Sequence, residues 1–213
     1  MKEKPYQTGL FGILSHLADL MILNILWILC CVPVFTIGAS TTALYTVTMK
    51  LLKGEGTPIV RTFFEAFRRN FKTATKTWLI LLVPSVLVVG SAVTVLLNLW
   101  DGAPAVRILA LAAAGIFWLA GNFVYPLTAY FDNSIGRTLL NALLMVFGDP
   151  VRALVIGAAS LIPFGIYMAD PSFFMGALIF WMIAGVGIIA DLQSRLFLRI
   201  FARYVEPAEE TTE

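Results

Sequence analysis

Long apolar stretches alternate with short polar ones along most of this chain. The apolar stretches lie at residues 17–37, 38–52, 77–99, 105–130, 151–169 and 173–190. About 20 apolar residues cross a hydrocarbon core of about 30 Å, and all the stretches except the second reach or approach that length. The pattern predicts an all-α fold, a polytopic transmembrane helical bundle of about six spans. We expect a single transmembrane domain over residues 1–206 and a disordered acidic tail over residues 207–213.

The second stretch, residues 38–52, is the shortest and the most polar. At about 1.5 Å per residue it is only about 22 Å long, so it is either a short buried span or a re-entrant segment. Because polar groups at this depth need protein around them, we expect other spans to enclose it. Its hydroxyls either bond back to carbonyls of their own helix or form a polar seam that faces a solute or a partner helix. The candidate seam residues are Thr41, Thr42, Tyr45 and Thr48.

The basic residues are sorted to one side of this topology. With six spans and the N-terminus inside, every one of the 15 Lys and Arg residues except Arg107 falls on the cytoplasmic side. Basic residues resist translocation, so their bias sets the orientation of a membrane protein. The sorting predicts a multi-pass membrane protein with both termini in the cytoplasm.

Composition excludes several classes of protein. The chain is 59% hydrophobic and 13% charged, with a mean hydropathy of +0.86, whereas soluble domains are about 25% charged. Phosphate-binding loops, zinc-protease motifs and serine-hydrolase motifs are missing from the sequence. Cys30 and Cys31 are adjacent within the first span, without metal-ligand spacing. We therefore expect no enzymatic activity, no cofactor, no metal and no nucleic-acid partner.

An amphipathic helix is predicted just before the third span. From Ile59 onward, aromatic residues recur every three or four positions, and basic residues occupy the other face. Such a helix lies in the membrane interface or docks into a groove of a partner protein. The interfacial or partner-binding candidates are Arg61, Phe64, Phe67, Arg68, Arg69, Phe71, Lys72 and, from a second copy of the pattern, Arg137.

The second copy of this pattern lies 76 positions further along the chain. There Arg137-Thr138 matches Arg61-Thr62, and Leu144 and Met145 replace Arg68 and Arg69. Each copy follows an inward-running span and precedes an outward-running one, which suggests a parallel internal repeat. Because the second copy has lost most of its charge, we expect it to be buried against the bundle.

Few polar residues lie near the apolar stretches. His16 and Asp19 are three positions apart near the inner end of the first span, so they either meet as a proton-relay pair or form an interfacial pair at a helix end. Asp191 and Arg195, four apart, predict a salt bridge.

Three segments resemble the YesL family of bacterial membrane proteins. They are residues 26–45 (LWILCCVPVFTIGASTTALY), within which TIGASTTA is the specific part, residues 63–72 (FFEAFRRNFK) and residues 137–145 (RTLLNALLM). Members of this family, a domain of unknown function, are frequently encoded in Gram-positive bacteria beside carbohydrate ABC importers and glycoside hydrolases.

The resemblance implies a protein of the bacterial cell membrane whose partners are the lipid bilayer and subunits of a carbohydrate ABC importer. The function it suggests is a non-catalytic accessory or assembly subunit for oligosaccharide uptake. The alternative is a small-solute permease or channel that acts in its own right. A continuous polar cavity would favour the permease, and a dry bundle would favour the accessory subunit.

Overall fold

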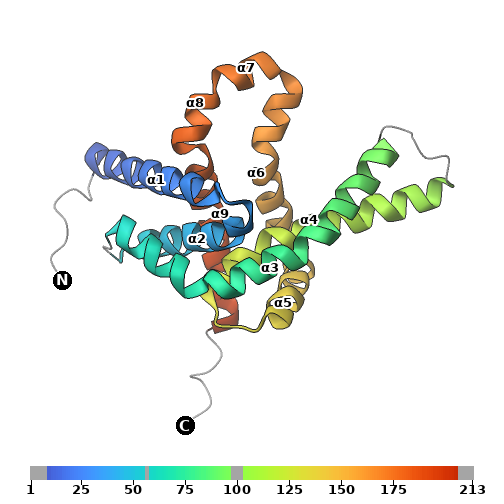
Figure 1. Ribbon diagram of the computed structural model, residues 1–213, viewed down its shortest axis with the longest axis horizontal. Helices are drawn as coiled ribbons and strands as arrows, with labels where there is room; N and C mark the ends of the chain where they lie inside the picture. The colour runs from blue at the N-terminus through green and yellow to red at the C-terminus, as the bar shows by residue number, and fades with distance from the viewer. Residues whose placement is uncertain (1–8, 56–57, 97–102, 206–213) are drawn as a thin grey trace, which may run out of the picture.

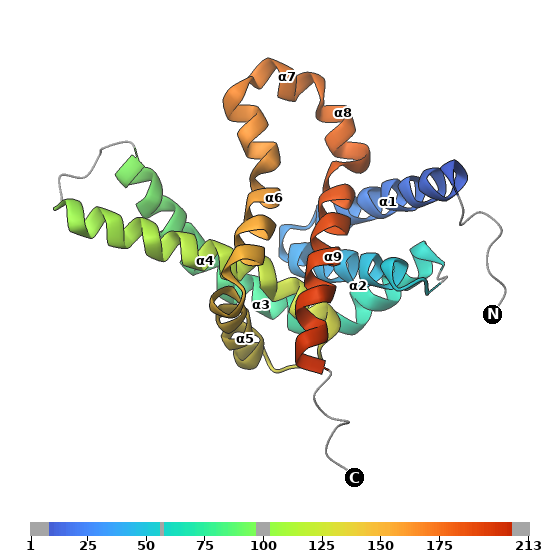
Figure 2. The same cartoon turned by 180° about the vertical axis from the view of Figure 1, so that it is seen from behind.

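The structure, a computed structural model, describes residues 9–55, 58–96 and 103–205, and the expected acidic tail at 207–213 lies outside them. All regular elements in these ranges are helical, which confirms the all-α expectation. The first half contains α1 (Leu10–Cys31), a 3-10 turn (Val34–Thr36), α2 (Ile37–Leu52), α3 (Ile59–Leu96) and α4 (Pro104–Tyr130). The second half contains α5 (Ile135–Gly148), α6 (Pro150–Ala169), α7 (Pro171–Gly176), α8 (Leu178–Phe180), a π-helical turn (Trp181–Gly185) and α9 (Val186–Val205) (Figures 1 and 2).

Five helical segments are long and apolar enough to cross a membrane. They are Phe11–Cys31, Ile59–Val95, Pro104–Tyr130, Pro150–Ala169 and Leu178–Val205. Helix α2 is not among them, because it has only 16 residues and about 20 are needed. The expected bundle of about six spans thus consists of five long helices and one short, enclosed one.

Helix α2 lies at the centre of the bundle, as its polarity predicted. Most of its residues are buried, and it packs against α1, α3, α4 and α9. The approach to α3 is close: a Cβ built on Gly38 would lie 2.5 Å from the carbonyl oxygen of Ala74. Small residues permit such contacts between helices, so the glycine allows α2 to occupy the core.

Helix α2 runs back alongside α1. Its first turn meets the end of α1, where the Ser40 hydroxyl donates to the carbonyl of Trp27 at 3.0 Å and the Trp27 indole donates to Thr41 Oγ1 at 3.1 Å. Its last turn reaches the end of α4, where Lys53 Nζ donates to the Tyr130 hydroxyl at 3.4 Å. Figure 1 shows that α2 ends on the side where α1 begins. A short helix therefore reverses the chain as a sixth span would.

Helix α3 joins the predicted amphipathic helix and the third span in one element of 38 residues. Its length is about 57 Å, nearly twice the hydrocarbon thickness of about 30 Å. All its Lys, Arg and Glu residues lie in its first half, up to Lys76. The first half of α3 thus belongs outside the hydrocarbon, and the second half is the span.

The helix starts agree with the spacing of the predicted parallel repeat. Helix α3 begins at Ile59 and α5 begins at Ile135, 76 positions later. In both helices the threonine three residues on is buried, at 6% exposure for Thr62 and 2% for Thr138. Helices α5 and α6 together correspond to α3, with a break at Asp149, whose carboxylate accepts a hydrogen bond from the backbone N–H of Arg152.

Helix α5 is buried against the bundle on one face. Thr138, Ala142, Met145 and Val146 are buried, whereas Leu140, Leu144 and Phe147 are 56%, 57% and 62% exposed. The expectation that this helix packs on the bundle therefore holds for one face, and three of its large apolar side chains lie on the exposed one.

Candidate functional site

The hydroxyls of α2 are satisfied inside the protein. Thr42 donates to the carbonyl of Gly38 at 2.9 Å, and Thr48 donates to the carbonyl of Leu44 at 3.1 Å. These bonds to residues four positions earlier are the local alternative predicted from the sequence. Thr48 and Ser194 of α9 also share a hydrogen bond of 2.8 Å, and Thr41 accepts its bond from Trp27. The predicted seam therefore faces neighbouring helices.

A chain of hydrogen bonds extends from this seam through four helices. The Tyr45 hydroxyl of α2 donates to Gln193 Oε1 of α9 at 2.5 Å. Gln193 Nε2 in turn donates to the Ser160 hydroxyl of α6 at 2.8 Å and to the carbonyl of Ile156 at 2.9 Å. Ser160 completes the chain by donating to the side-chain oxygen of Asn122 in α4. Because a satisfied buried network fixes helix positions, it acts here as a structural junction.

Sequence reasoning missed the central residue of this junction. Gln193 follows the last apolar stretch and lies in the basic part of α9, where a polar side chain is expected to be exposed. It is only 2% exposed. One signal was available: Ser194 and Gln193 interrupt the apolar residues on the α9 face that carries Phe197 and Phe201.

His16 has a different partner from the one that its spacing suggested. His16 Nε2 lies 3.0 Å from Asp191 Oδ1, not beside Asp19. The other oxygen of Asp191 accepts from Arg195 Nε at 3.1 Å, which confirms the predicted salt bridge. His16 and Asn24 both contact α9 from the same helix, α1. The cluster ties the start of α1 to α9.

Asn24 makes the second connection between α1 and α9. Its side-chain amide donates to the carbonyls of Trp181 and Met182, at 3.3 Å and 2.8 Å, and its oxygen accepts from the N–H of Gly187 at 2.8 Å. These backbone groups belong to the π-helical turn and the start of α9. In a π-helical turn the backbone hydrogen bonds differ from the regular i→i+4 bonds of an α-helix. The Asn24 side chain therefore compensates for the irregular backbone.

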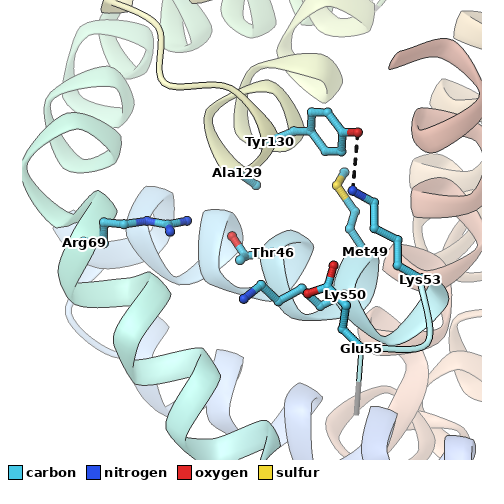
Figure 3. A pocket seen from close by; sticks show the side chains of 8 residues that line it. All are labelled: Thr46, Met49, Lys50, Lys53, Glu55, Arg69, Ala129 and Tyr130. Carbon is cyan, nitrogen blue, oxygen red and sulfur yellow. Dashed lines mark hydrogen bonds between the residues drawn. The ribbon is translucent and has the colours of Figure 1, made fainter. Parts of the chain in front are cut away.

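A basic pocket opens beside the last turns of α2 (Figure 3). Its volume is about 160 Å³, and it is lined by Thr46, Met49, Lys50, Lys53, Glu55, Arg69, Ala129 and Tyr130. Lys53 Nζ lies 4.4 Å from the centroid of the Tyr130 ring, a cation–π contact. The pocket thus combines residues of α2, the segment after it, α3 and α4.

The basic residues of α3 divide between two surfaces. Arg61, Arg68 and Lys72 recur at seven and four positions and are exposed, and the guanidinium of Arg61 pairs with Glu65 at 2.7 Å. Arg69 is one position, about 100°, away from Arg68 and lines the pocket. We call Arg61, Arg68 and Lys72 the basic stripe; Arg137 of α5 is exposed on its own helix.

The aromatic residues of α3 are partly covered by the protein itself. Phe63 is fully buried. Phe67 lies between Phe63 and Phe71, with ring centroids 6.3 Å and 5.5 Å away, and both Phe67 and Phe71 are half-buried. Phe64 is 38% exposed. Most of the aromatic face therefore packs on the protein itself, which leaves the basic stripe as the free surface of this helix.

The part of the chain that the structure describes contains no group of three or more His, Cys, Asp or Glu residues that could hold a metal ion. Cys30 and Cys31 are free thiols.

The comparison with protein families supports a coarse assignment. Residues 20–91, about a third of the chain, match a family described as "Protein of unknown function, DUF624". The match includes the TIGASTTA motif, α2 and the basic half of α3. It agrees with the expected resemblance to a domain of unknown function. No curated protein and no solved structure matches the chain.

Proposed function

We propose that this protein is a non-catalytic accessory or assembly subunit of a carbohydrate ABC importer in the bacterial cell membrane. The observation that supports it best is the junction around α2. Thr41, Tyr45 and Thr48, the side chains that a solute path along α2 would expose, bond to protein groups on α1, α2 and α9. A closed junction of this kind suits a scaffold more than a conduit. The link to sugar uptake rests on the resemblance to the YesL family.

The surface proposed for the partner is the basic stripe. Arg68 and Lys72 have no ion-pair partner among the residues that the structure describes. Free cations four residues apart on a rigid helix complement an acidic surface and steer association. The helix they lie on is held to α2 by its buried face, so the stripe is presented in a fixed orientation.

The alternative function is a small-solute permease or channel. Its support is the parallel repeat of α3 with α5 and α6, an architecture found in some transporters. Uptake of a labelled sugar by proteoliposomes containing this protein alone would favour it over the accessory role.

Reversing the charge of the stripe is expected to abolish partner binding. The change Arg68→Glu with Lys72→Glu places two like charges against an acidic partner, which costs several kcal/mol. Importer subunits recovered with the tagged protein from native membranes should fall at least about tenfold. The measurement is quantitative mass spectrometry of the copurified proteins, together with growth on the imported sugar.

Two controls accompany this experiment. The charge-preserving change Arg68→Lys with Lys72→Arg should retain the partner, and Arg199→Glu tests reversal of an exposed charge on α9. Unchanged recovery with the double reversal would exclude the stripe as the docking surface. Absence of any importer subunit with the unaltered protein would refute the accessory role itself.

We further propose that both termini, the basic stripe and the pocket face the cytoplasm. The support is the bias of Lys and Arg residues and the return of the chain by α2. With Cys30 and Cys31 replaced by Ser, an impermeant thiol reagent should label Ser172→Cys in intact cells. Glu55→Cys and Arg137→Cys should be labelled only after permeabilisation. Labelling of Glu55→Cys in intact cells would show that α2 does not return the chain to the inner side.

A further inference from the structure

The basic pocket beside α2 gathers three cations from separate parts of the chain. Lys50 comes from α2, Lys53 from the residue that follows it, and Arg69 from α3. Figure 3 shows Arg69 and Lys50 extending their charged ends into the same space next to Thr46. One carboxylate, Glu55, also lines the pocket, so the lining carries an excess of positive charge.

These cations have no carboxylate partner. Among the residues that the structure describes, no ion pair involves Lys50, Lys53 or Arg69. By contrast, Arg152 and Arg203 both bridge to Asp149. Unpaired like charges that share one cavity repel each other, and an anion bound between them would remove that repulsion.

The size and lining of the cavity suit a phosphate group. A volume of about 160 Å³ exceeds the space that one water requires, about 10–15 Å³ on the same measure. Lys and Arg are the side chains that bind phosphate through charge-assisted hydrogen bonds, and the hydroxyls of Thr46 and Tyr130 add polar partners. The apolar parts of Met49 and Ala129 also line the cavity, as a glycerol or acyl portion next to the phosphate would require.

We propose that this pocket binds an anionic phosphate ester, with Lys50, Lys53 and Arg69 as its contacts. The bound phosphate belongs either to the headgroup of an anionic phospholipid or to a free phosphate compound. This site is independent of the proposed importer role, because it uses Arg69 and α2 but not the basic stripe.

The experiment compares two variants that remove the same charge from the same end of the protein. The pocket variant carries Lys50→Gln, Lys53→Gln and Arg69→Gln, and the stripe variant carries Arg61→Gln, Arg68→Gln and Lys72→Gln. Native mass spectrometry of the detergent-solubilised protein measures retention of dioleoyl phosphatidylglycerol, with dioleoyl phosphatidylcholine as the zwitterionic reference. We expect the pocket variant to lose at least about tenfold in retention of phosphatidylglycerol and the stripe variant no more than about twofold.

Competition with inorganic phosphate distinguishes the two sources. Displacement of phosphatidylglycerol by millimolar phosphate would identify a site open to free phosphate, and retention would identify a lipid site. Equal losses in both variants would overturn the proposal in favour of diffuse attraction to the basic surface, and so would no loss in the pocket variant.

A single change checks the assignment without the risk that a triple variant fails to fold. Glu55→Gln removes the one carboxylate of the lining and should raise retention of phosphatidylglycerol severalfold, because it removes a repulsive charge. A fall in retention with Glu55→Gln would contradict the charge arrangement on which the site rests.

Discussion

A Gly38→Ala protein is expected to be strongly destabilised. The added Cβ would lie 2.5 Å from the carbonyl oxygen of Ala74 and 2.8 Å from Trp78 Cβ. The first of these is a backbone atom, so the contact is relieved only if α2 and α3 separate. Overpacking of this kind costs about 3 kcal/mol or more, and the loss is large because α2 is in contact with four other helices. The measurement is the thermal midpoint and the monodisperse fraction in detergent.

Gly90→Ala is the matched control in the same helix pair. A Cβ at Gly90 would meet nothing within 4 Å, and alanine favours a helix over glycine by about 1 kcal/mol. The control should therefore leave the thermal midpoint unchanged or raise it. An unchanged midpoint in Gly38→Ala would show that α2 and α3 do not pack this closely.

The second large effect is expected at the hydrogen-bonded junction. Gln193→Leu keeps most of the side-chain volume but leaves the buried Tyr45 hydroxyl without its acceptor. It also removes the donor to Ser160. An unsatisfied buried polar group costs about 1–3 kcal/mol, so Gln193→Leu should destabilise the protein by about 2–4 kcal/mol. Chemical or thermal unfolding in detergent measures this difference.

A double-mutant cycle separates the hydrogen bond from general packing. Tyr45→Phe removes the hydroxyl, and combining it with Gln193→Leu replaces both partners by apolar groups, which costs little beyond the packing change. The double variant should thus be more stable than the sum of the single losses predicts, by about 1 kcal/mol or more. Strict additivity would mean that Tyr45 and Gln193 do not interact.

Much of the fold could be predicted from the sequence because bilayer and backbone constraints act locally along the chain. A hydrocarbon core requires apolar helices of a given length, so the five long helical segments coincide with apolar stretches. Hydroxyl-to-carbonyl bonds within a helix depend only on spacing, and those of Thr42 and Thr48 were one of the two alternatives that the sequence predicted. The repeat is visible in the sequence as the match of Arg61 with Arg137, and the helix starts at Ile59 and Ile135 have the same spacing.

The contacts between helices were decided only by the tertiary structure. The spacing suggested Asp19 as the partner of His16, but the packing of α1 against α9 places His16 beside Asp191. Hydropathy predicted that α5 is buried, but it did not separate the buried Met145 and Val146 from the exposed Leu144 and Phe147.

The sequence did not distinguish the role of Arg69 from that of Arg68. The structure distinguishes them, because α2 and α4 form the other walls of the pocket that Arg69 lines. The physical reason is clearest for the apolar side chains. Lipid solvates an apolar side chain as well as a protein core does, so within a membrane the apolar pattern reveals which segments are helices but not which face of each helix is turned inward.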